Sequence, residues 1–145
     1  MSESTSSGGD TTPAFSGVHH INLSVTDLER SVAWYREVLG LEMGWEVPDE
    51  DGQGRKFALL HPGSPLRIVL SYHRSNPGDP ASEFRTGLDH VAFTVADRAE
   101  LEAWVRRFEE LKVDHSPIKE GATGYLITFR DPDNVQLEMY TRSKV

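Results

Sequence analysis

Apolar and polar residues alternate in two stretches of the chain, residues 18–25 and residues 88–95. This period of two is typical of a β-strand with one buried face. The apolar positions are Ile21, Leu23 and Val25 in the first stretch and Val91, Phe93 and Val95 in the second. The polar-face positions are His20, Asn22 and Ser24 in the first and His90, Ala92 and Thr94 in the second. Both stretches therefore predict strands that carry a histidine on the face opposite the core.

A helix pattern follows each predicted strand. Asp27 is the expected N-cap of the first helix and Gly40 its C-terminal stop, while Asp97 is placed to cap the second. The two copies keep a constant offset of 70 residues (90 − 20), which also pairs Trp34 with Trp104. Both tryptophans are predicted to lie in the core. The chain thus repeats one supersecondary unit, and neither copy can bury its apolar face alone.

Three further strands are predicted after each helix. They cover residues 41–47, 56–61 and 66–73 in the first unit and 114–119, 125–130 and 135–141 in the second. The predicted fold class is therefore α+β, with paired βαβββ units. We expect one domain over residues 15–145, with units at about 17–74 and 88–142 joined by a linker at 75–87. Residues 1–14 are predicted to be a disordered N-terminal segment.

Composition limits the possible partners. The chain has 145 residues, a net charge of −8 with scattered basic side chains, and no cysteine. We expect no nucleic-acid or membrane partner and favour a small-molecule ligand. The lack of cysteine excludes disulfides, a thiolate nucleophile and cysteine-based zinc sites. Residues 1–14 lack the apolar run of a signal peptide, so a cytoplasmic location is expected.

The alternation places three metal-binding side chains on the polar faces of their strands: His20, His90 and Glu138. A single histidine on a strand is more often an ordinary polar residue than a ligand. Two imidazoles and one carboxylate in repeat register, however, form a ligand set for a divalent metal. Three ligands leave coordination positions open, which is typical of an activating site rather than a closed structural one.

Three motifs resemble the vicinal oxygen chelate superfamily of glyoxalase I, extradiol dioxygenases, fosfomycin-resistance enzymes and bleomycin-binding proteins. They are the segments at residues 19–41, 89–95 and 131–138. The resemblance implies a metal-binding cup between curved sheets, with His20, His90 and Glu138 as ligands. The family's fourth ligand position falls on Val69, or on Leu70 if the register slips by one, and neither side chain binds metal. This argues against glyoxalase and epimerase chemistry.

The lead hypothesis is therefore a single-domain Fe(II) dioxygenase of the extradiol type, acting on a small aromatic or polyphenolic substrate with vicinal oxygens. The alternatives are a glyoxalase- or fosfomycin-resistance-type isomerase or transferase, and a drug-binding protein without catalysis. Iron is the expected metal, with Mn, Ni or Zn as alternatives. The resemblance also implies a homodimer in which His20 of one subunit joins His90 and Glu138 of the other.

Further residues are assigned to this site. His73 is the candidate acid/base, and His19 is expected to face the helix or the sheet edge without a function. Thr128 stands where larger extradiol enzymes carry a tyrosine. The predicted substrate-binding residues are Arg67, Val69, Ser71, Thr128 and Tyr140, with Trp45 and Phe57 as further candidates to line the pocket.

Overall fold

The structure, a computed structural model, describes residues 11–50 and 52–145. The first unit comprises β1 (Ile21–Ser24), α1 (Leu28–Leu39), β2 (Glu42–Val47), β3 (Gly54–Leu60) and β4 (Arg67–His73). The second comprises β5 (His90–Val95), α2 (Arg98–Glu110), β6 (Lys119–Glu120), β7 (Tyr125–Arg130) and β8 (Gln136–Thr141). This order confirms the predicted α+β fold of paired βαβββ units. Ten residues of the predicted N-terminal segment, 1–10, lie outside the described residues.

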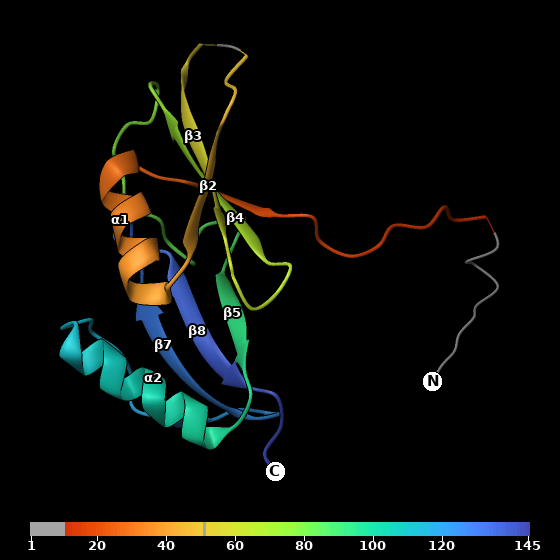
Figure 1. Ribbon diagram of the computed structural model, residues 1–145, viewed down its shortest axis with the longest axis vertical. Coiled ribbons are helices and arrows are strands. Elements are labelled where there is room, and N and C mark those ends of the chain that lie inside the picture. The colour runs from red at the N-terminus through yellow and green to blue at the C-terminus, as the bar shows by residue number, and fades with distance from the viewer. Residues whose placement is uncertain (1–10, 51) are drawn as a thin grey trace.

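Each unit folds into a four-stranded mixed sheet. The strand orders are β1-β4-β3-β2 and β5-β8-β7-β6, and the first strand of each unit pairs in parallel with the last. Both helices lie on the same side of the molecule in Figure 1, and the described residues before β1 extend away on the opposite side. β1 is an edge strand of the first sheet, and β5 is an edge strand of the second. The two histidines lie at the beginnings of these edge strands.

The helix ends match the sequence prediction. The Asp27 carboxylate accepts a hydrogen bond from the Arg30 backbone N–H at 3.1 Å, and Gly40 ends α1 with a φ of 72°. At α2, the Asp97 carboxylate accepts one from the Glu100 backbone N–H at 2.9 Å. Each cap satisfies a backbone donor that the helix itself leaves free. Within the described residues no helix has the length and apolarity needed to cross a membrane.

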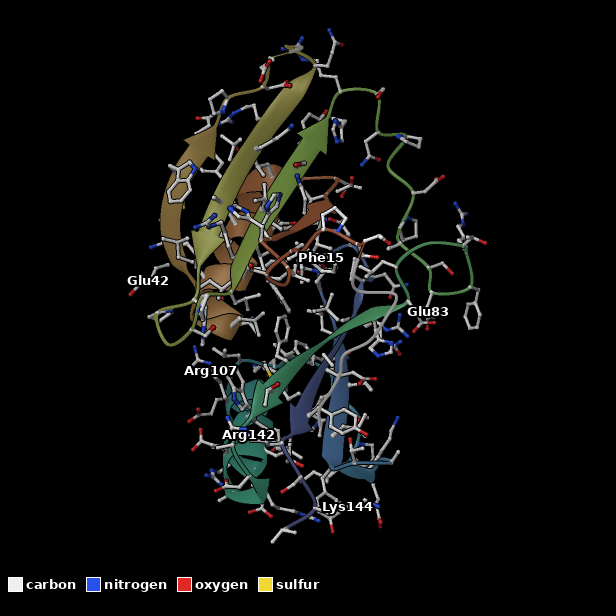
Figure 2. The ribbon with its side chains drawn as sticks, turned by 90° about the vertical axis from the view of Figure 1, so that its right-hand side faces the viewer. Phe15, Glu42, Glu83, Arg107, Arg142 and Lys144 are labelled. Atoms are coloured by element: carbon white, nitrogen blue, oxygen red, sulfur yellow. The ribbon has the colours of Figure 1, made fainter. Side chains whose placement is uncertain are left out.

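One continuous core joins the two units. The Trp34 ring stacks on Phe129 of the second unit, with ring centroids 6.3 Å apart. Both Trp34 and Trp104 are only partly buried, and they pack against the edge of this core. The Arg107 guanidinium, labelled in Figure 2, donates to the backbone carbonyl of Val38 at 3.0 Å and so ties α2 to the end of α1.

Two predicted strands differ from the structure at their ends. The strand predicted at 114–119 is wrong: only His115 forms an isolated bridge, to Phe129, and β6 has two residues. Pro117 explains this, because proline has no N–H to donate to a ladder. The first strand begins at Ile21, three residues later than predicted, because its ladder with β4 starts at the pair Ile21 and Ile68. His20 therefore lies just before β1.

Two buried carboxylates also hold the units together. Asp131 accepts hydrogen bonds from the Tyr35 hydroxyl at 2.7 Å and from the backbone N–H groups of Asp133 and Val135. Asp133 accepts from the backbone N–H of Thr26 at 3.1 Å and from its hydroxyl. Burial raises the pKa of Asp131, and these hydrogen bonds partly oppose that rise. The turn before β8 is thus fixed to the start and the middle of α1.

We expect Asp131→Ala to lower the free energy of unfolding by about 3 kcal/mol, because it leaves buried donors without an acceptor. Asp131→Asn keeps an acceptor oxygen and removes the buried charge, so it should cost far less. The pKa is raised in the folded state, so wild-type stability falls as pH rises from the unfolded pKa through the folded one. The Asp131→Asn protein has no carboxyl group to titrate at this position. Its stability relative to wild type should therefore increase over that pH range. Urea unfolding across pH measures both effects, and equal destabilisation by Ala and Asn would contradict the prediction.

Candidate metal site

The second unit brings His90 and Glu138 together. His90 begins β5, Glu138 lies on the adjacent strand β8, and His90 Nε2 is 3.7 Å from Glu138 Oε1. Glu138 is 9% exposed, and within the described residues its one ion-pair partner is His90. A buried carboxylate requires a compensating positive group. This half of the site therefore suits a cation between the two side chains.

Asp89 sets the orientation of the His90 ring. Its carboxylate Oδ1 lies 2.7 Å from His90 Nδ1, and the Gln136 side-chain amide donates to the same oxygen at 3.3 Å. A carboxylate can only accept, so Nδ1 carries the proton and Nε2 faces Glu138. Carboxylates commonly orient metal-binding histidines in this way. The hydrogen bond to Asp89 raises the pKa of His90; partial burial opposes the rise, and the charges of Glu138 and Asp89 add to it.

The first unit holds His20 in a different hydrogen-bond arrangement. His19 lies between two groups, with its Nε2 3.3 Å from Arg67 Nη1 and its Nδ1 2.9 Å from His20 Nδ1. A guanidinium can only donate, so His19 Nε2 accepts and His19 Nδ1 donates to His20. In a neutral His20 ring the proton then lies on Nε2. Metal binding by either nitrogen of His20 therefore requires this chain of hydrogen bonds to rearrange.

The three predicted ligands do not meet within one chain. Among residues 11–50 and 52–145, no group of three or more His, Asp or Glu side chains lies close enough to hold a metal ion. His90 and Glu138 form one part of the predicted ligand set, and His20 lies apart on the other unit. The donor types fit a divalent metal, yet a single chain presents them in two halves.

The remaining predicted residues divide between the same two halves. Thr128 lies directly opposite Glu138 in the β7–β8 ladder, and Tyr140 lies two residues further along the same face of β8. Arg67, Val69 and Ser71 alternate with the core residues Ile68 and Leu70 of β4, so they lie on the sheet face opposite the helix. The Ser71 hydroxyl donates to Asn22 Oδ1 at 2.6 Å.

Two candidates lie away from the His20 end of this face. His73 is six residues from Arg67 on β4, roughly 20 Å along the strand. Its role as an acid/base stays a prediction. Phe57 pairs with the core residue Leu70 and lies on the helix side of the sheet, so it does not line the cup. Trp45 does face the cup, where the Arg67 guanidinium lies 5.4 Å from its ring centroid.

Sequence reasoning missed the two residues that contact Nδ1 of the candidate ligands. Asp89 does so at His90 and His19 at His20, and each directly precedes its histidine. The offset of 70 residues relates them (89 − 19), so the sequence repeat could have identified this pair of positions. The two positions differ chemically, because a carboxylate can only accept a hydrogen bond and an imidazole can do either.

Known proteins share this arrangement of elements. The family model of the Glyoxalase/Bleomycin resistance protein/Dioxygenase superfamily matches residues 17–139. Glutathione transferase FosA of Serratia marcescens is 32% identical over 87% of this chain and 81% of its own. A domain named for the same superfamily, from Frankia sp. EAN1pec, is 32% identical with a TM-score of 0.79 and covers 88% of this chain and 98% of its own.

A third comparison concerns the fold alone. A mutant of the fosfomycin resistance protein FosX from Listeria monocytogenes, solved with Mn(II) and a dihydroxypropylphosphonic acid, is 24% identical. Its TM-score is 0.64, over 88% of this chain and 93% of its own. The family match spans both units and all three motifs of the candidate site. The chain therefore belongs to the Glyoxalase/Bleomycin resistance protein/Dioxygenase superfamily.

Proposed function

We propose that this protein is a divalent-metal-dependent enzyme whose metal is held by His20 of one subunit and by His90 and Glu138 of its partner in a homodimer. The observation that supports this most directly is the split site. His90 and Glu138 are preassembled at 3.7 Å, while His20 is held elsewhere in the same chain. A two-fold related copy would supply the third ligand to each of two equivalent sites.

The surfaces beside the histidines support association. β1 and β5 are edge strands, and a free edge is a template for another chain. Val18 is 81% exposed two residues before His20, and Leu88 is 51% exposed two residues before His90. Isolated exposed apolar residues are common. Two of them at repeat-related positions, each beside a candidate ligand, fit a surface that a second copy covers.

The side chains around the ligands suit activation of a substrate bound through two oxygens. A divalent metal with open positions supplies Lewis acidity and, if it is iron, O₂ chemistry. Asp89 orients His90, and Thr128 places a hydroxyl opposite Glu138. Val69, buried on the cup face, offers no proton acceptor. We therefore propose an Fe(II) dioxygenase of the extradiol type acting on a small aromatic diol.

A thiol transferase is the second candidate. The likeness to glutathione transferase FosA favours it, because that relative is 32% identical over most of both chains. Thiol transfer also acts on a small substrate bound to the metal. It does not require a fourth protein ligand at the position of Val69. In this case the metal would be Mn(II) or another divalent ion, and fosfomycin with glutathione is the first substrate pair to test.

Oxygen uptake distinguishes the two candidates. We expect protein reconstituted anaerobically with Fe(II) to consume O₂ when a set of substituted catechols is added, and to leave glutathione and fosfomycin unchanged. Glu138→Ala is the control, since it lacks one proposed ligand and should be inactive. Glutathione consumption dependent on fosfomycin and Mn(II), without O₂ uptake, would contradict the dioxygenase and support the transferase.

A further inference from the structure

Arg67 begins β4 on the cup face of the first sheet. The next residue, Ile68, is buried in the core and pairs with Ile21, the first residue of β1, so Arg67 lies at the end of the sheet where His20 directly precedes β1. Its guanidinium lies over the Trp45 ring at 5.4 Å, and its Nη1 is 3.3 Å from His19 Nε2. This places a permanent positive charge beside a candidate metal ligand.

In the part of the chain that the structure describes, the charge of Arg67 is not neutralised by a carboxylate. Within residues 11–50 and 52–145, no Asp or Glu oxygen forms an ion pair with Arg67, although the chain has a net charge of −8. Its Nε is covered by protein atoms and has no hydrogen-bond partner. The protein atoms that cover Nε keep a ligand away from it, so an anion from outside the chain would be bound by the Nη groups of Arg67. A carboxylate matches the fork of guanidinium donors.

Trp45 and its neighbours give this position a flat, apolar surround. Trp45 is 48% exposed and pairs with Ala58, which in turn pairs with Val69 on β4. Ala58 and Val69 are themselves buried, at 1% and 6% exposure, so Trp45 supplies the exposed apolar surface at this position. Gly44 lies in the irregular part of the β2–β3 ladder, and a Cβ there would lie 2.6 Å from the Ala58 carbonyl oxygen, so the strands approach closely beside Trp45 only because this residue is glycine.

We propose that Arg67 and Trp45 form a subsite for the carboxylate of a flat aromatic acid, with the acid group on Arg67 and the ring beside Trp45. The proposal rests on the proposed function, because it places this ligand in the cup that holds His20. It makes an aromatic acid, rather than a neutral aromatic diol, the preferred substrate class. Arginine and an aromatic face together select for negative charge and planarity.

The test compares two matched probes on the metal-loaded protein without oxygen. Isothermal titration measures binding of 3,4-dihydroxybenzoate and of 3,4-dihydroxybenzamide, which has nearly the same shape without the charge. We expect wild type to prefer the acid by about 10- to 100-fold, the range for a lost charge-assisted hydrogen-bond pair. Arg67→Gln should remove this preference and leave amide binding nearly unchanged, and Arg67→Lys should retain part of it. Trp45→Ala should weaken both probes.

Arg55→Gln is the matched control. Arg55 lies on the other face of the same sheet, where it pairs with Glu29 and Glu46, and its variant should keep the wild-type preference. Thermal unfolding of each variant verifies that it is folded. Equal binding of acid and amide by wild type, no measurable binding of either, or an acid preference that survives in folded Arg67→Gln would overturn the proposal.

Metal content on the same samples separates this subsite from the proposed function. Arg67→Gln is expected to keep its metal, and loss of that metal would assign Arg67 to the metal site and overturn the subsite. If wild type and Glu138→Ala hold equal metal while the acid preference still depends on Arg67, the proposed function fails and the subsite stands. If metal binding behaves as proposed while acid and amide bind equally, the subsite alone fails.

Discussion

Glu138→Ala protein is expected to lose essentially all bound metal under dialysis that leaves wild type with about one divalent ion per chain. The carboxylate is the anionic member of the proposed set, and His90 alone faces it at 3.7 Å. Its removal leaves two imidazoles that lie on different units of each chain. Two such ligands should bind far more weakly than three. Elemental analysis after anaerobic reconstitution with Fe(II) measures the result.

His73→Ala provides the control for this experiment. His73 shares the cup face of β4 with Arg67 but lies at the opposite end of the strand. Its variant should therefore keep the wild-type metal content, whether or not His73 takes part in proton transfer. Stoichiometric metal in Glu138→Ala would mean that the ion binds elsewhere, and the proposed ligand set would be wrong.

The sequence predicted local features well because their causes are local. Asp27 and Gly40 mark the ends of α1 through their own capping groups, and the structure has both in those roles. The alternation about His90 and Glu138 correctly placed these residues on one face, since side chains on a strand alternate between its two faces. Each of these predictions depends on a few neighbouring residues.

Features that depend on distant partners were harder to predict. The strand expected at 114–119 failed for a local reason instead, because Pro117 within it cannot donate to a ladder and the apolar pattern alone does not take proline into account. Phe57 was a candidate to line the cup, whereas pairing with Leu70 places it on the helix side. The separation of His20 from His90 depends on how two whole units pack, and no local pattern encodes that packing.

The packing of the units also determines the outcome of a subunit-mixing experiment. We expect a mixture of His20→Ala and Glu138→Ala subunits to bind metal although neither variant binds it alone. In the mixed dimer one site lacks both ligands and the other is intact. With random pairing of equal amounts, half of the dimers are mixed and half of their sites are whole, so about a quarter of wild-type metal should return.

A second mixture serves as the control. It tests whether metal binding returns only when the two substitutions lie in different units of the chain. His90→Ala and Glu138→Ala both alter the second unit, so every site in their mixed dimer lacks one ligand and no metal should return. Differently tagged subunits, purified as mixed dimers, raise the expected content of the first mixture to about half of wild type. If proven mixed dimers of His20→Ala and Glu138→Ala stay metal-free, each site is built within one chain. That result would require the two units to reorient, because the described part of a single chain does not gather His20, His90 and Glu138 into one group.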